Sequence, residues 1–385
     1  MIKVIQSTTH WLPQTQTWIY NQVKNLPGDI NTHIVCEKTL NYDQFYIDNI
    51  HQISKTPVLK FLSSIQKFKV SSFIRLFWLY FNFRRFKADI IHSHFGHIGW
   101  YDSLLIRWIS ARHVVTFYGY DVKRLPKQNK KWLKRYKSLF KNTDLVLCEG
   151  EHMARCIIKL GCPESKIKVN HLGVNTGSIP FRPRSCMPKE QLRILIAASF
   201  REKKGIPSAI EALGQFQKEN NSIEKITIIG DATEEEHSKQ EKRRIIHSIK
   251  RNRLSSRVKL LGFKRYDTLM KESYNHHIFL SPSITANDGD TEGGAPVTII
   301  EMMATGMLVV STSHCDIPGV VKYGNENWLV PENDITELSN RLKWLSENRE
   351  SWEPMIFKGR NHIEKEFDTI HQSHRLAQHY KSLLK

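Results

Sequence analysis

Two glutamates, Glu292 and Glu301, are the residues of this chain best suited to bind hydroxyl groups. They occur in Ser281–Glu301, a stretch dense in glycine and acidic residues that lies between two apolar segments of the kind that form buried strands. The order strand, glycine-rich loop, helix, strand predicts a βαβ unit, with its helix opening at Ala295–Pro296. Free N–H groups and partial positive charge at such a helix start favour an anion such as phosphate. The stretch therefore predicts a site that binds sugar or ribose hydroxyls beside a phosphate.

This stretch resembles the signature of retaining GT-B glycosyltransferases of family four (glycosyl transferases group 1), in which two glutamates flank seven residues. In those enzymes the first glutamate works at the donor sugar and the second holds the nucleotide ribose. Here eight residues separate Glu292 from Glu301, and the first position counted back from Glu301 is Gly293. A one-residue bulge in the Gly293–Gly294 loop would leave Glu292 in the first role. The resemblance assigns the whole loop and helix start to the donor, namely Gly293, Gly294, Ala295, Pro296 and Val297.

The loop AASFREKKGIPSAIEAL resembles the family's diphosphate-binding loop, which begins with Gly-Arg and ends with Lys-Gly. Lys204 and Gly205 match its end. Ser199 falls in the arginine position and Arg201 follows two residues later, so either Arg201 or Lys203–Lys204 with helix N-termini would contact the diphosphate. The alternative is an ordinary polar turn from strand to helix.

Further on, GFKRYDTLM resembles the family's nucleobase-contacting stretch and indicates Phe263 as a contact.

The first half of the chain carries matching strand ends. HSHFGHIG, after an expected strand at Asp89–Ser93, resembles the family's His-x-His-Phe-Gly and implies that His94 and Gly96 lie near the acceptor or the donor sugar. We expect His92 and His94, which alternate along the strand, to point to opposite faces, which disfavours a metal site between them. In TFYGYD, Tyr118 stands where the family has a histidine at the reaction centre. Tyrosine can donate a hydrogen bond but is no base near neutral pH without a large pKa shift.

Two successive strand–helix series predict an α/β protein with two Rossmann-like domains. We expect an N-terminal acceptor domain over residues 1–175, a linker over 176–191 with three prolines, and a C-terminal donor domain over 192–368. The resemblance covers nearly the whole chain, with its motifs in the family's order. It implies the GT-B fold, with the domains facing each other across a cleft and a last helix, about 369–385, packing back on the first domain.

The chain of 385 residues is basic, with 57 lysines and arginines against 38 aspartates and glutamates. Most of the excess lies in residues 1–190, which carry 29 basic and 12 acidic residues. Such one-sided charge indicates that one domain faces an anionic partner. Residues 59–87 mix aromatic and basic side chains, and residues 121–141 hold nine basic residues against one acid. Each segment is open to two interpretations: a packed or solvated helix, or a surface for an anionic membrane or a diphosphate-linked acceptor.

Composition and residue spacing indicate which classes of protein and of site this chain belongs to. A mean hydropathy of -0.43 is typical of a soluble globular protein, and the richest apolar stretch is too short to span a bilayer. Six cysteines without a CxxC spacing favour free thiols in a reducing cytosol. Asp288-Gly289-Asp290 is similar to a metal-binding Asp-x-Asp, but the resemblance implies a family that works without a metal. We expect no cofactor and no metal, and a cytoplasmic protein peripherally associated with the inner face of the membrane.

We therefore expect a retaining hexosyltransferase that moves a sugar from a nucleotide-diphosphate-sugar donor to a hydroxyl of a lipid-linked or anionic saccharide acceptor. Its expected setting is the biosynthesis of a cell-surface polysaccharide: exopolysaccharide, capsule or lipopolysaccharide. The catalytic residues implied are Glu292, His94 and Tyr118. The alternatives are a transferase of the same fold with a soluble acceptor, a nucleic-acid-binding protein, or an inactive relative.

Overall fold

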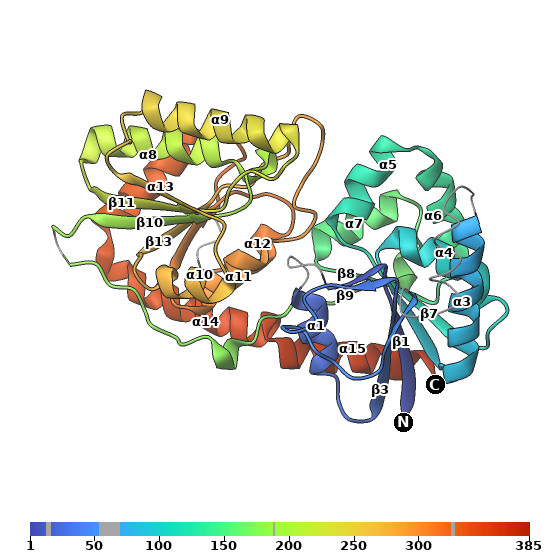
Figure 1. Cartoon of the computed structure of the whole chain (residues 1–385). Helices are drawn as coiled ribbons and strands as arrows, with labels where there is room; N and C mark the ends of the chain where they lie inside the picture. The colour runs from blue at the N-terminus through green and yellow to red at the C-terminus, as the bar shows by residue number, and fades with distance from the viewer. Residues whose placement is uncertain (13–16, 54–69, 188, 325–327) are drawn as a thin grey trace. The chain divides into compact units, whose positions relative to one another are not determined.

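The computed structural model describes residues 1–12, 17–53, 70–187, 189–324 and 328–385. The chain folds into two compact units, which we describe separately (Figure 1). Unit 1 comprises Met1–Asn175 and Asp368–Lys385, and unit 2 comprises Thr176–Phe367. The segment 176–191, expected to be a linker outside both domains, is part of unit 2. Arg184 fixes it there, because its buried guanidinium donates hydrogen bonds to the main-chain oxygens of Ser273, His276 and Thr305.

Unit 1 is built on a seven-stranded parallel sheet in the order β5-β3-β1-β6-β7-β8-β9. Strands that helices cover on both faces read as apolar runs, as the buried sequence LVLC of β8 does. The strands are β1 (Ile2–Ser7), β3 (Ile30–Cys36), β5 (Ile50–Gln52), β6 (Ile90–His94), β7 (Arg112–Thr116), β8 (Leu145–Cys148) and β9 (Ile167–Val169), beside a small pair of β2 (His10–Trp11) and β4 (Lys38–Thr39).

The helices of unit 1 include α15, the last of the chain, which packs on the sheet of this unit. Leu376, Ala377 and Tyr380 of α15 are buried in one cluster with Val4 and Val114. The helices described are α1 (Thr17–Lys24), α3 (Val70–Phe86), α4 (Gly96–Ile106), a π-helix (Tyr120–Arg124), α5 (Leu125–Gln128), α6 (Lys131–Lys141), α7 (Glu151–Lys159) and α15 (Thr369–Leu383). In α6 the buried residues Trp132, Tyr136, Leu139 and Phe140 follow helical spacing, so the lysines of this helix face solvent.

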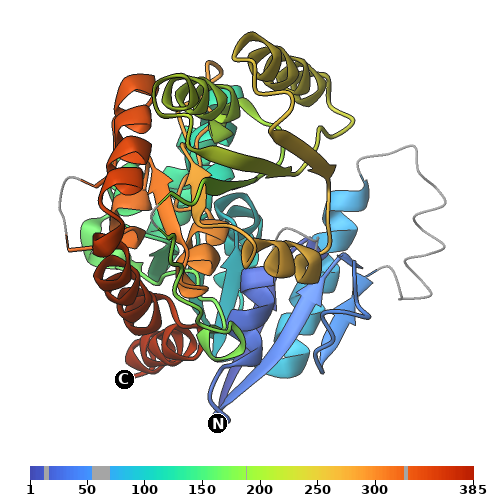
Figure 2. The same cartoon turned by 90° about the vertical axis from the view of Figure 1, so that its left-hand side faces the viewer.

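Unit 2 is built on a five-stranded parallel sheet in the order β12-β11-β10-β13-β14. Its helices α8 and α9 lie side by side (Figures 1 and 2). The strands are β10 (Leu192–Ala197), β11 (Ile223–Ile229), β12 (Val258–Gly262), β13 (Ile278–Ser281) and β14 (Leu308–Ser311). The helices are α8 (Ile206–Asn220), α9 (Glu236–Arg251), α10 (Tyr266–Ser273), α11 (Val297–Ala304), α12 (Ile317–Val320), α13 (Ile335–Glu347) and α14 (Trp352–Phe367).

Each sheet has one point where the strand order reverses. In unit 1, β1 lies between β3 and β6, and in unit 2, β10 lies between β11 and β13. Helices on opposite faces of the sheet diverge at such a point, which opens a place for a ligand beyond the carboxyl ends of the two strands. The residues that the sequence singled out lie at or beyond the carboxyl ends of β6, β7, β10, β12 and β13.

The expected elements agree with the structure to within a few residues, with one shift at the glycine-rich loop. Helix α11 begins at Val297, and Pro296 is its N-cap residue rather than its first helical residue, because its ψ of 128° is extended. Of the segment 59–87, residues 59–69 lie outside the described residues. Among the helices that the structure describes, none is long and apolar enough to cross a membrane.

Candidate active site

The structure brings together two residues that the sequence assigned separately, Lys204 and Glu292. Lys204 follows β10 and Glu292 follows β13, and these strands are neighbours in the sheet of unit 2. The Nζ atom of Lys204 lies 2.8 Å from Oε1 of Glu292, and the hydroxyl of Ser283 donates to the same oxygen at 2.7 Å. The side chains are 18% and 6% exposed. The pair lies at the reversal point of the sheet, where a ligand is expected.

The environment of Glu292 keeps its carboxylate charged. Burial pushes the pKa of Glu292 up, but the positive charges of Lys204 and Lys203 outweigh burial, so that the pKa is lowered. The main-chain N–H of Glu292 donates to Nε2 of His314 at 3.1 Å. His314 in turn donates from Nδ1 to Glu332 at 2.6 Å. His314 supports Glu292 through this contact between two loops.

The Asp288-Gly289-Asp290 segment forms a tight turn. The main-chain N–H of Asp290 donates to Oδ1 of Asp288 at 2.8 Å, and Gly289 has a φ of 83°. The cation beside Asp290 is Lys203, whose Nζ lies 3.4 Å from Oδ1 of Asp290 and 2.8 Å from the main-chain oxygen of Thr291. Lys203 and Lys204, both in the loop after β10, therefore each contact an acidic residue of the glycine-rich loop: Lys203 contacts Asp290 and Lys204 contacts Glu292.

Gly205 sits where the loop after β10 approaches the loop after β13. Its φ of 61° lies in the left-handed region, and a Cβ added there would collide with the main-chain oxygen of Pro282. Arg201 points elsewhere, because its guanidinium contacts Glu235 at 3.3 Å. Ser199 is half-buried at the start of the same loop, and its main-chain oxygen accepts a hydrogen bond from the main-chain N–H of Arg201. Lys203 and Lys204, rather than Arg201, are thus the cations of the loop after β10 that face the glycine-rich loop.

Glu301 lies in the second turn of α11 and contacts α10. Burial raises the pKa of Glu301 to about 7, and a hydrogen bond from the hydroxyl of Tyr266 opposes the rise. Tyr266 was not singled out from the sequence, although it lies in the stretch that indicated Phe263. Phe263 itself is exposed after β12.

The residues between the glutamates form a turn followed by the start of α11, which begins at Val297 rather than at Ala295–Pro296. Gly293 has a φ of 81°, a conformation open to glycine, and it stands where the extra residue between the glutamates was expected. Gly293 and Gly294 are buried, whereas Ala295, Pro296 and Val297 are half-buried.

In unit 1, the predicted residues His94 and Tyr118 contact each other. Nδ1 of His94 lies 2.8 Å from the Tyr118 hydroxyl, and Nε2 lies 2.9 Å from Oε1 of Gln6. Both ring nitrogens of the buried His94 are therefore engaged within the protein. Burial raises the pKa of Tyr118 well above its usual value, which keeps its hydroxyl protonated.

The expectation that His92 and His94 point to opposite faces of their strand is wrong. Residues two apart in a strand share a face, and the two rings stack with their centroids 4.5 Å apart. Their ring nitrogens contact hydroxyl and amide groups of the protein.

Asp121 is a residue whose role the sequence did not reveal. Its buried carboxylate accepts the main-chain N–H groups of Gly96 at 2.5 Å and of Tyr118 at 2.8 Å. Burial raises the pKa of Asp121 to about 7 against these hydrogen bonds. Phe95, between His94 and Gly96, has a φ of 78°, which is unusual for a residue other than glycine. Asp121 therefore joins the loop after β6 to the loop after β7.

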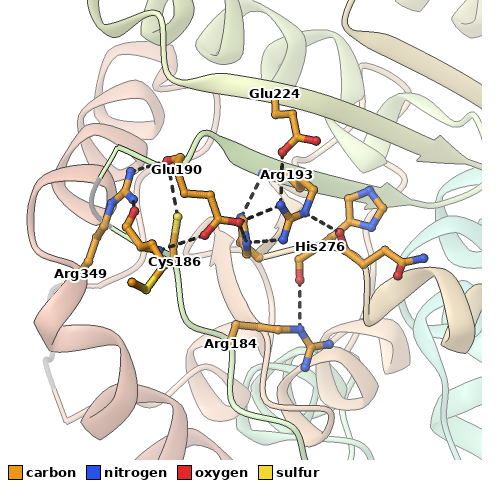
Figure 3. A network of polar contacts seen from close by, with 10 residues as sticks. Arg184, Cys186, Glu190, Arg193, Glu224, His276 and Arg349 are labelled. Atoms are coloured by element: carbon orange, nitrogen blue, oxygen red, sulfur yellow. Dashed lines mark hydrogen bonds and ion pairs between the residues drawn. The ribbon is translucent and has the colours of Figure 1, made fainter.

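A thiol, a carboxylate and an imidazole come close enough in unit 2 to hold a metal ion, at Cys186, Glu190 and His277. The guanidinium of Arg193 already contacts two of them, with Nη1 2.8 Å from Glu190 (Figure 3) and Nη2 2.7 Å from His277. Arg349 donates to the main-chain oxygen of Glu190 at 2.7 Å. Two guanidinium groups repel a further cation, so we interpret this network as a structural connection between residues 186–193 and β13.

Known proteins show the same two-part organisation. The profile named Glycosyltransferase Family 4 matches residues 15–178, and the profile named Glycosyl transferases group 1 matches residues 180–362. AmsK of Erwinia amylovora, an amylovoran biosynthesis glycosyltransferase, is 33% identical over 291 residues, which cover 74% of this chain and 68% of AmsK. WcaL of Escherichia coli, named for colanic acid biosynthesis, is 34% identical over 286 residues, with the same coverage of 74% and 68%.

Solved structures share the fold at lower sequence identity. HepE of Anabaena, determined in complex with UDP and glucose, superposes with a TM-score of 0.79 at 15% identity over 99% of this chain and 100% of HepE. A glycosyltransferase from Rickettsia africae gives a TM-score of 0.77 at 17% identity over 100% of this chain and 99% of its own. Both units are Rossmann-like, and the fold is GT-B. This chain belongs to the glycosyltransferases of family four, and the group 1 domain forms most of its unit 2.

Proposed function

We propose that this glycosyltransferase moves a hexose from a nucleotide-diphosphate sugar to a hydroxyl of a lipid-linked or anionic saccharide acceptor, with retention of anomeric configuration. Its setting is the assembly of a cell-surface polysaccharide. Support for the setting comes from AmsK and WcaL, which are named for amylovoran and colanic acid biosynthesis. Support for the donor class comes from HepE, which was solved with UDP and glucose.

The observation that carries the proposal is the contact of Lys204 with Glu292 at the reversal point of the unit 2 sheet. A lysine there can neutralise the diphosphate, both in the bound donor and as it departs. The adjacent carboxylate can accept hydrogen bonds from sugar hydroxyls, and Glu301 can do the same for the ribose. Charge stabilisation and orientation supply the catalysis, with no resident metal or cofactor.

The acceptor proposal rests on exposed aromatic and basic side chains of unit 1. Phe77 and Phe81 are 73% and 57% exposed on α3, and Arg84 and Arg85 are exposed one turn further along the same face. Rings that insert at the level of the headgroups, beside cations that attract anionic lipid, are typical of a membrane-surface helix.

The end of α4 extends this surface. Trp108 is 65% exposed, and the Arg107 guanidinium lies 5.3 Å from its ring centroid. Helix α4 contacts α3 (Figure 1). We define the α3–α4 surface as Phe77, Phe81, Arg84, Arg85, Arg107 and Trp108, and propose that it binds the inner face of the membrane, where a lipid-linked acceptor is reached.

A thermal-shift and calorimetric screen with UDP-, GDP- and ADP-sugars tests the donor proposal. We expect one nucleotide class to raise the melting temperature, and Lys204→Ala and Glu301→Ala each to weaken its binding at least tenfold. Lys239→Ala is the matched control, since Lys239 pairs with the fully exposed Glu234 on the surface of the same unit. Equal binding by all variants, or no response of the wild type to any donor, would overturn the proposal.

A further inference from the structure

Six buried side chains of unit 1 form one continuous chain of hydrogen bonds. In order they are Tyr118, His94, Gln6, Tyr380, His92 and Thr116, and the successive distances are 2.8, 2.9, 3.2, 2.6 and 2.6 Å. Three strands, the loop after β7 and helix α15 contribute to it. Each member is at most 7% exposed. The chain therefore links the Tyr118 hydroxyl to a helix at the far end of the sequence.

The amide of Gln6 fixes the direction of every bond in this chain. Its oxygen accepts from Nε2–H of His94, so that Nδ1 of this neutral ring must accept the hydrogen of Tyr118. Its nitrogen donates to the Tyr380 hydroxyl, which then donates to Nδ1 of His92. Nε2–H of His92 completes the series by donating to Thr116. Burial lowers the pKa of His94 to about 3 and that of His92 well below its usual value, so each ring carries one hydrogen.

A half-turn of the same amide would reverse all five bonds together. Tyr118 would then accept from His94 and point its own hydrogen away from the chain. The orientation of Gln6 thus decides whether the Tyr118 hydroxyl offers a lone pair or a hydrogen to a neighbouring oxygen. Tyr380 is the partner of the amide nitrogen, and the packing of α15 on the sheet with Val4, Ile90 and Val114 fixes its position.

We propose that Gln6 and Tyr380 are positioning residues that set the direction of the Tyr118 hydroxyl toward the bound sugars. This inference rests on the proposed function and on the family resemblance, which implies that Tyr118 stands at the position of the histidine at the reaction centre. It gives the C-terminal helix, which carries none of the motifs of the sequence, a part in the site of unit 1.

A double-mutant cycle between Tyr380→Phe and Tyr118→Phe tests the inference. We expect Tyr380→Phe alone to lower kcat about tenfold with KM within twofold, since one lost hydrogen bond of about 1.4 kcal/mol corresponds to that factor. In the Tyr118→Phe background, the same substitution should lower kcat no further, because the hydroxyl that it positions is absent. Tyr323→Phe is the control, since its buried hydroxyl accepts the N–H of Val309 in unit 2. Equal losses in both backgrounds, or no loss from Tyr380→Phe, would overturn the inference.

A spectroscopic readout separates this inference from the proposed function. Nitrogen-15 spectra of selectively labelled histidines report which ring nitrogen carries the hydrogen, whether or not the protein turns over a sugar nucleotide. Tyr118→Phe should shift the nitrogen-15 signals of certain histidines. We expect Tyr380→Phe to shift the same signals and Tyr323→Phe to leave them in place. If Tyr380→Phe leaves those signals unchanged, the hydrogen-bond chain does not couple the two residues. Wild-type protein without turnover of any UDP-, GDP- or ADP-sugar would contradict the proposed function alone.

Discussion

Nζ of Lys204 lies 2.8 Å from Oε1 of Glu292, although the two residues are 88 positions apart in the sequence. In the free protein, the lysine proposed to bind the donor diphosphate is thus held by the glutamate proposed to work at the donor sugar. A bound diphosphate would compete for Lys204 and release charge on Glu292 beside the sugar. The site geometry and the α3–α4 surface each have consequences that can be measured.

Replacing Lys204 should affect stability and donor binding in separable ways. Lys204→Met leaves the carboxylate of Glu292 buried with less compensating positive charge. We expect a loss of about 2–3 kcal/mol in the free energy of unfolding. Breaking a fully buried ion pair costs about 3–5 kcal/mol, and the cost is smaller here because Lys204 is partly exposed. Adding Glu292→Gln should recover most of that loss but not the binding of the sugar nucleotide. Urea denaturation and calorimetry measure the two effects. Recovery of binding in the double variant would contradict the assigned role of Lys204.

Glu301 should make donor binding depend on pH near neutrality. Its pKa is raised to about 7, and only the ionised carboxylate accepts hydrogen bonds from two ribose hydroxyls. We therefore expect the nucleotide Kd to fall as the pH rises from 6 to 8, and Glu301→Gln to remove this dependence. An unchanged pH profile in Glu301→Gln would show that another group titrates.

The raised pKa of Glu301 also determines how the free energy of unfolding changes with pH. The folded protein holds the Glu301 proton more tightly than the unfolded chain does, so the free energy of unfolding should decrease as the pH rises from about 4.5 to about 7 and level off above that. Asp121, whose pKa is also about 7, adds a slope of the same sign in unit 1. The contribution of Glu301 is therefore read as the difference between wild type and Glu301→Gln in urea denaturation over this pH range.

Gly205→Ala should destabilise unit 2 through the backbone alone. The left-handed φ and the collision of a Cβ with the oxygen of Pro282 together lead us to expect a loss of about 1–3 kcal/mol. Gly319→Ala, at a helical position of the same unit with nothing within 4 Å of its Cβ, should be neutral or slightly stabilising. Thermal unfolding of both variants distinguishes a local clash from a general sensitivity of glycines.

Asp121→Asn should loosen the two loops that hold Tyr118. The amide presents one oxygen where the carboxylate accepts N–H groups on both of its oxygens, so one buried N–H loses its acceptor, at a cost of about 1–3 kcal/mol. The exposed Asp29 pairs with Lys381 on the surface of the same unit, and Asp29→Asn is the control, with an expected change of about 0–1 kcal/mol. Hydrogen exchange at Gly96 and Tyr118 should accelerate in Asp121→Asn, and unchanged exchange would remove Asp121 from this role.

The α3–α4 surface should bind anionic vesicles. We expect the wild type to sediment with vesicles of 30% phosphatidylserine and far less with pure phosphatidylcholine, and Phe77→Ser with Phe81→Ser to reduce sedimentation at least fivefold. The control is Phe357→Ser, at an exposed phenylalanine of unit 2. Binding that survives the double substitution would mean that another surface contacts the lipid.

Local sequence patterns predicted much of the fold. Apolar runs bounded by polar loops predicted the strands, since parallel strands are buried on both faces. The order of the motifs gave the family, and the glycines at 205 and 293 occur where the backbone adopts a positive φ. Each of these features depends on a few residues that are neighbours in the sequence, so it can be predicted from the sequence alone.

The contacts between distant residues were decided by the tertiary structure. Nothing in the sequence indicates that His314 supports Glu292, that Asp121 joins two loops, or that Tyr380 reaches Gln6. Each contact depends on which strands are neighbours in a sheet and on where a helix docks. Arg201, two residues after the position where the family has its arginine, turns to Glu235, whereas Lys204 faces Glu292. The sequence determined which residues stand at the strand ends, and the packing of the sheets and helices decided which side chains meet there.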